Sequence, residues 1–254
     1  MIALARAEWL KLRSTRTALA LFIIILVITL VPLILLLAFL PKDWLETDGV
    51  TGFLNTASAL VPLALLVFGI LGMTNEYRHG TITYAYLVTP RRWQVMLVKL
   101  VVYAVVGMAM MLLAVVLVYV VISLGGLVRG VSIDATGGST LGDYARQIVV
   151  AGLITAFGVA LGALVRAQVI TVAAALIWAL AAEPAIALVK PAVGTWLPFS
   201  VFNQVSAAQL SSNAAGSSLT TADLTRPAAF LVSIAYIAIV GLAAIYISLR
   251  RDVT

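Results

Sequence analysis

The residues that could do chemistry are scarce in this chain, and many of them gather in residues 75–92, NEYRHGTITYAYLVTPRR. The stretch holds one carboxylate, three arginines and the only histidine of the chain, His79. Long apolar runs flank it on both sides. A single imidazole argues against a histidine-based metal site or proton relay. We therefore interpret the stretch as a surface on which another protein acts.

Other catalytic signals are weak. The chain has no cysteine, which excludes disulfides, thiolate catalysis and cysteine-based metal sites. It has no Gly-x-Ser-x-Gly or His-Glu-x-x-His motif, no aspartate pair in its apolar runs and no Walker-type phosphate loop. We expect no catalytic residue, no metal site and no bound cofactor in this chain. A nucleotide-driven process would need an ATPase on another chain.

One carboxylate, Glu183, lies clearly within an apolar run. Such a residue either serves a transport path or reaches for water near the membrane interface. Lys190, seven residues later, could share its helix face and neutralise it. We favour the structural interpretation and keep the functional one as an alternative.

The composition is that of an integral membrane protein. Of 254 residues, 63% are hydrophobic and 10% are charged, whereas soluble domains carry about 25% charged residues. The apolar runs are long and continuous, which indicates spanning helices rather than a β-barrel. The net charge of +6 is typical of basic cytoplasmic loops, and we expect no nucleic-acid partner.

The pattern predicts one all-α transmembrane domain over residues 1–254. The first apolar run, of about 23 residues, is longer than a signal-peptide core, so we expect it to remain as a span. Six spans are predicted, at about 17–40, 53–74, 94–123, 144–165, 168–189 and 227–249.

Residues 1–16 predict a short amphipathic helix in the membrane interface. On a helical wheel one apolar face is flanked by charges; the face holds Ile2, Ala5, Trp9 and Leu12, with Arg6 and Arg13 on one side and Glu8 and Lys11 on the other. The alternative is a basic flank that only orients the first span.

Two of the connections between spans, and one glycine motif within a span, have recognisable sequence patterns. Residues 124–143 are rich in Gly, Ser and Thr and predict an exposed loop. Residues 190–226 form an outer segment whose first part is apolar but broken by prolines, which favours short interfacial or re-entrant helices. Gly158 and Gly162 form a GxxxG pattern, either a chance pair or a dimer seam.

Charge counting predicts that both termini are cytoplasmic. With the N-terminus inside, 11 of the 16 basic residues and only three of the ten acids face the cytoplasm. Residues 75–92 then lie inside. Within them, Gly80-Thr81 can end span two and cap a short helix of about 81–88. Thr89-Pro90 is a good start for the next helix. The alternative is an ordinary basic loop that only sets topology.

At these residues the sequence resembles the permease subunit of type-2 ABC exporters. The resemblance rests on Glu76 at the end of span two, Gly80-Thr81, the short helix, Pro90-Arg91-Arg92 and Lys99 early in span three. The six-span frame and the basic N-terminal helix agree with it.

The resemblance implies a bacterial plasma-membrane protein that pairs with a second permease copy, as a homodimer or related heterodimer, and with two copies of a separate ATP-binding subunit that carries ATP and Mg. The implied ATPase-coupling residues are Glu76, Arg78, His79, Gly80, Thr81, Pro90, Arg91 and Arg92, and Trp9, Arg6 and Arg13 mark the N-terminal docking helix. Candidate path residues are Asn55, Thr56, Trp178 and Glu183.

The implied cargo is a small hydrophobic or amphipathic molecule, a lipid, a peptide or an ion, moved outward, with drug or antibiotic resistance as one setting. Aromatic residues make up 8% of the chain and form no belt along one span, so a sugar polymer is not favoured over these. Two alternatives remain open: an ion- or proton-coupled secondary transporter, and a non-transporting membrane scaffold.

Overall fold

The computed structural model describes residues 2–39, 49–88, 91–130, 138–206 and 224–250, and all regular elements among them are helices. Six of these helices are long and apolar enough to cross a membrane, as predicted. In chain order the elements are α1 (Ile2–Ser14), α2 (Arg16–Phe39), α4 (Gly49–Arg78), α5 (Thr81–Val88), α6 (Arg92–Arg129), α7 (Gly138–Val165), α8 (Gln168–Ile177), the π-helical turn η1 (Trp178–Ala182), α9 (Glu183–Val189), α10 (Pro191–Gly194), α11 (Pro198–Ser206) and α12 (Arg226–Arg250).

Helix α7 is the centre of the bundle, packed against α4, α6 and α12. A side chain at Gly158 would collide with the backbone of Leu66 on α4, and one at Gly162 with the backbone of Ile70. The GxxxG pattern therefore brings two helices of the same chain together, because only glycine permits so close an approach. In this structure the pattern serves neither as a chance pair nor as a seam between chains.

The predicted loop at 124–143 is too long. Helix α6 continues to Arg129 and ends at Gly130, whose φ of 66° gives the left-handed C-cap that glycine adopts most easily. The extra turns are held by α2: Arg129 Nη1 donates to the carbonyl oxygen of Leu37 at 2.6 Å. The side chain of Leu37 also packs over Gly125. At 38 residues, α6 is about 57 Å long.

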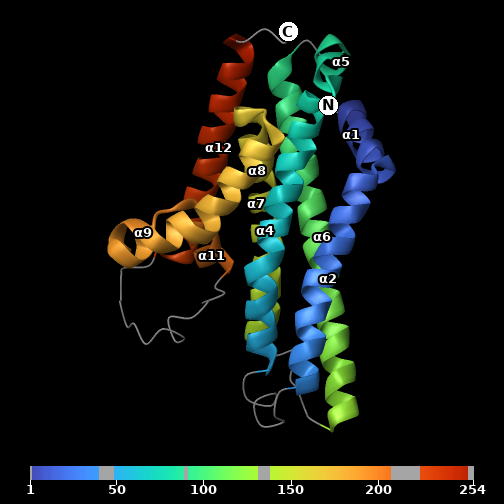
Figure 1. Cartoon of the computed structure of the whole chain (residues 1–254), viewed down its shortest axis with the longest axis vertical. Helices are drawn as coiled ribbons and strands as arrows, with labels where there is room; N and C mark the ends of the chain where they lie inside the picture. The colour runs from blue at the N-terminus through green and yellow to red at the C-terminus, as the bar shows by residue number, and fades with distance from the viewer. Residues whose placement is uncertain (1, 40–48, 89–90, 131–137, 207–223, 251–254) are drawn as a thin grey trace.

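The segment from α8 to α9 leaves the bundle, and α11 returns to pack against α7 and α12. Figure 1 shows α8 descending obliquely and α9 lying to one side of the other helices. Short helices α10 and α11 occupy residues 191–206 of the predicted outer segment. Their placement at an interface or as a re-entrant pair stays a prediction, and residues 207–223 lie outside the described part.

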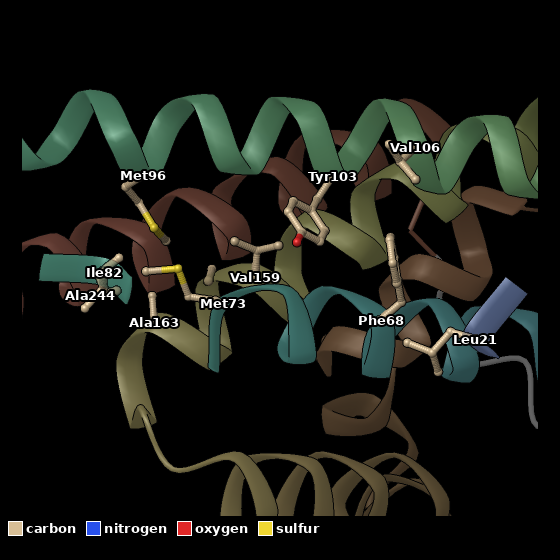
Figure 2. Close-up of a cluster of buried hydrophobic side chains, with 11 residues drawn as sticks. Leu21, Phe68, Met73, Ile82, Met96, Tyr103, Val106, Val159, Ala163 and Ala244 are labelled. Carbon is tan, nitrogen blue, oxygen red and sulfur yellow. The ribbon is translucent and has the colours of Figure 1, made fainter. Parts of the chain in front are cut away.

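The start of α1, the last described turn of α12 and helix α5 all lie at one end of the bundle (Figure 1). An even number of spans requires this arrangement of the ends. Which side of the membrane this end faces stays a prediction from the charges. Near it, a buried apolar cluster joins α4, α5, α6, α7 and α12; Figure 2 shows Met73, Ile82, Met96, Ala163 and Ala244 in contact.

Candidate functional site

Helix α5 is a short helix held rigidly between two spans. Helix α4 ends at Arg78, and Gly80 turns the chain with a φ of 66°. The sequence placed Thr81 at the N-cap, but Thr81 is already the first residue of α5, so Gly80 takes the capping position. Ile82 is buried in the apolar cluster of Figure 2 and fixes the helix to the bundle.

The opposite face of α5 is open and apolar. Tyr84 and Leu87 are 72% and 75% exposed. The two side chains are three residues apart and therefore lie on one face of the helix; their role in docking stays a prediction. Helix α5 ends at Val88 as predicted, but α6 begins at Arg92 with Arg91 before it, so Pro90 is not the first residue of that helix.

The other predicted coupling residues divide between this surface and the interior. Arg78, His79, Gly80, Thr81 and Arg91 are exposed around α5. Thr89, Pro90 and the side chain of Arg92 lie outside the described part.

Glu76 lies beneath this surface, in a buried ion cluster. Lys99 Nζ donates to Glu76 Oε1 at 2.6 Å and to Glu8 Oε2 at 2.8 Å. Lys11 makes a further ion pair with Glu76. Lys99 is fully buried, and Glu76 and Glu8 are only 3% and 6% exposed. The cluster thus ties α1, α4 and α6 together at the level just below α5.

The cluster balances two carboxylates with two ammonium groups. Burying charges is costly, so such a group is stable only with its partners in place. Removing one partner from a buried pair costs about 3–5 kcal/mol, because the remaining charge is left uncompensated. One carboxylate oxygen, Glu76 Oε2, has no hydrogen-bond partner among the residues that the structure describes. The helices are therefore fixed relative to one another by an arrangement in which Lys99 bridges both carboxylates.

A small cavity lies at the junction of α1 and α2. Its volume of about 30 Å³ suits a single water molecule. It is lined by Leu12, Thr15, Leu21, Phe68, Leu71, Gly72, Asn75 and Tyr103.

A helix, α1, is present at the N-terminus, and its buried side is defined by Glu8 with partly buried Leu12. Arg6, Trp9 and Arg13 are exposed on its other sides. The sequence placed Glu8 on a flank of the apolar face; the structure turns it inward because Lys99 needs a counter-charge. Whether α1 lies in the membrane interface stays a prediction.

Two of the four candidate path residues are brought together. Trp178 Nε1 donates to Glu183 Oε1 at 2.9 Å across the π-helical turn. The backbone N–H groups of Phe199 and Ser200 donate to the same carboxylate at 3.0 and 3.1 Å. Glu183 therefore caps the first turn of α11, since these N–H groups have no partner within that helix.

Among the described residues, no ion pair joins Glu183 to Lys190, which is exposed just after α9. The predicted neutralisation by Lys190 is wrong: N–H dipoles of α11 and the indole hold the carboxylate instead. Asn55 and Thr56 belong to the first turns of α4, but their side chains lie outside the description.

Sequence reasoning missed the pairing of Glu8 and Lys11 with Glu76 and Lys99. The signal was present, because a lysine inside an apolar run needs a buried partner. The sequence alone does not say which of the ten acids supplies it. The partners of Glu183 on α11 carried no such signal, since every residue except proline has a backbone N–H group.

Among the described residues, no group of three or more metal-ligating side chains could hold a metal ion. Comparison with protein families shows that the family model described as ABC-2 family transporter protein matches residues 4–182. No curated protein sequence matches the chain. The matched region contains α1, α5 and the whole ion cluster, and it covers more than two thirds of the 254 residues. The chain belongs to the ABC-2 family of transporter proteins.

Proposed function

We propose that this chain is the membrane-spanning permease subunit of an ATP-driven exporter in the bacterial plasma membrane. Two copies, or one copy and a related chain, pair with two copies of a separate ATP-binding subunit that carries ATP and Mg. The permease has no ATPase site of its own. The cargo is a small hydrophobic or amphipathic molecule, a lipid, a peptide or an ion, moved outward.

The observation that carries this proposal is the presentation of α5. An apolar surface with Tyr84 and Leu87 stands at the end of the bundle, and Arg78, His79 and Arg91 surround it. Beneath it, the ion cluster joins the two flanking spans to α1. A force applied to α5 by an ATP-binding subunit is therefore transmitted to three helices together, because a packed interior does not deform locally.

The experiment compares two double variants in cells that make both subunits. In Tyr84→Ala with Leu87→Ala the docking surface loses its two large side chains, and co-purification of the ATP-binding subunit is expected to fall at least tenfold, as loss of interface anchors costs about 2 kcal/mol or more. Leu127→Ala with Val128→Ala removes two exposed apolar side chains at the far end of α6 and serves as the matched control.

A second variant separates docking from coupling. Gly80→Pro cannot adopt the φ of 66° found there, because proline is fixed near −65°. Because Gly80→Pro retains the exposed Tyr84 and Leu87 side chains, the ATP-binding subunit is expected to remain bound while ATP hydrolysis no longer drives transport. Normal transport in Gly80→Pro and in the Tyr84/Leu87 variant would show that residues 75–92 only set the topology.

A further inference from the structure

The turn between α7 and α8 contains an arginine in an unusual conformation. Arg166 has a φ of 63°, and it is the one residue other than glycine in the described part with a positive φ. This region favours glycine, and a large charged residue is seldom kept in it without a functional reason. The Arg166 N–H donates to the carbonyl of Gly162 at 3.0 Å and ends α7.

The guanidinium of Arg166 has no counter-charge within the described part of the chain. It lies over the ring of Tyr77, 5.2 Å from the ring centroid. Its Nε and Nη2 are shielded from water and donate to no acceptor among the described residues. The ion pairs of the described residues leave Arg166 without a carboxylate. An arginine offers five donors in a planar fork that matches phosphate oxygens.

Further positive character gathers at the same turn. Arg78 Nη1 donates to Gln168 Oε1 at 3.1 Å, which brings a second guanidinium beside the start of α8. Helix α8 begins at Gln168 after Ala167, which provides no side-chain cap. Its first N–H groups carry the positive end of the helix dipole. The turn therefore combines two guanidinium groups with a helix N-terminus.

The surface below this turn is apolar. Val169, Ile170 and Ile177 of α8 are all exposed large aliphatic residues. A molecule that is anionic at one end and hydrocarbon along its length matches this arrangement. Figure 1 shows the start of α8 set back from α5 along the long axis of the bundle, which favours a membrane lipid over the soluble subunit proposed to contact α5.

We propose that the α7–α8 turn binds the phosphate of an anionic phospholipid, with Arg166 and Arg78 on the headgroup and the exposed face of α8 along an acyl chain. The bound lipid supplies the negative charge that Arg166 lacks. This site adjoins the surface proposed to dock an ATP-binding subunit and shares Arg78 with it, whereas Arg166 belongs to the lipid site alone.

The test is native mass spectrometry of the detergent-purified chain titrated with phosphatidylglycerol or phosphatidylcholine. The unaltered chain is expected to retain phosphatidylglycerol preferentially. Arg166→Gln is expected to weaken that retention about fivefold, the effect of one basic residue near an anionic lipid, and Arg78→Gln less. Arg226→Gln, an exposed arginine at the start of α12, is the matched control and should change nothing.

Two variants separate the charge from the turn. Arg166→Lys keeps the charge and should keep most of the preference. Arg166→Gly fits the positive φ without strain, so it should fold normally and yet lose the lipid. Equal retention by Arg166→Gly and the unaltered chain would overturn the proposal even if Arg166→Gln failed to fold.

Two further results would also overturn it. If millimolar inorganic phosphate displaced phosphatidylglycerol completely, the site would be one for free phosphate. If Arg166→Gln released a co-purified ATP-binding subunit while lipid retention stayed unchanged, the partner would be a protein. Failure of the proposed exporter function alone would leave the lipid titration unaffected, so the two proposals are distinguishable.

Discussion

Two buried carboxylates are held in this chain by different means. Glu76 lies between two ammonium groups, those of Lys99 and Lys11, which come from two other helices. Glu183 is held by neutral donors: the indole N–H of Trp178, the hydroxyl of Ser200 and two backbone N–H groups of α11. Both are about equally buried. Glu76 is thus stabilised by the charged ends of two lysine side chains. Glu183 is stabilised mostly by backbone N–H groups at the start of a helix.

The difference shows what each carboxylate can do. The ion cluster joins three helices, so its charged groups stay within ion-pair distance only while those helices keep their positions. A movement of α1, α4 or α6 would therefore disrupt its ion pairs. The cap on α11 instead fixes one short helix to the π-helical turn, and most of its donors belong to the backbone. We infer that the Glu76 cluster couples any movement of α5 to α1, α4 and α6. Glu183 instead fixes the position of α11 relative to α9.

The largest expected effect is that of Lys99→Met. The change leaves Glu8 and Glu76 buried beside one another without the ammonium group between them, which costs about 3–5 kcal/mol of unfolding free energy. Unfolding of the purified chain in mixed micelles with increasing SDS measures the loss. Lys190→Met, at an exposed lysine, should change it by less than about 0.5 kcal/mol. A similar small loss in both variants would show that the cluster is not energetically important.

Glu183→Gln is expected to have a smaller effect, about 1–3 kcal/mol. The amide keeps one acceptor oxygen, but its NH₂ group faces donors and leaves at least one of them without a partner. Hydrogen exchange should rise at the amides of Phe199 and Ser200 and stay unchanged around Glu76. Faster exchange around Glu76 as well would show that the two regions are coupled.

The same variant addresses the alternative of proton coupling. If Glu183 only caps α11, transport by Glu183→Gln keeps the pH dependence of the unaltered chain, although its rate falls. Loss of the pH dependence would favour a proton-coupled transporter over an ATP-driven one. Transport into proteoliposomes at several pH values, with and without ATP, measures both.

Much of the fold was predictable because apolar runs of span length leave few alternatives in a membrane. The six spans, the break at Gly80 and the end of α5 at Val88 were predicted and are observed. The extension of α6 to Arg129 was not, since a Gly/Ser/Thr-rich sequence predicts a loop while packing against Leu37 extends the helix. Contacts with a neighbouring helix can therefore extend a helix into residues whose local sequence predicts a loop.

The candidate site was predictable only in part. The exposed residues around α5 followed from charge and turn signals, which are local in sequence. The ion cluster joins residues that are 91 and 23 positions apart, and one sequence contains no information on such pairings. The direction of the Glu76 side chain was missed for the same reason: Glu76 precedes the turn by one helical turn of α4 and faces Lys99, not the surface.

The smallest effect is expected for Lys11→Gln, which tests whether Lys11 contributes to the stability of the ion cluster. The Lys11 side chain is 45% exposed, whereas Lys99 is fully buried. An ion pair with an exposed partner contributes about 0–1 kcal/mol, because water already solvates the Lys11 ammonium group. Glu76 keeps the ammonium group of Lys99 at 2.6 Å after the change. The unfolding free energy should therefore fall by less than about 1 kcal/mol, and added salt should shrink the difference further. A loss as large as that of Lys99→Met would mean that α1 is held to the bundle chiefly through Lys11. In that case Glu76 would be neutralised from the surface, and the contrast between a buried ion cluster and a helix-capping carboxylate would no longer hold.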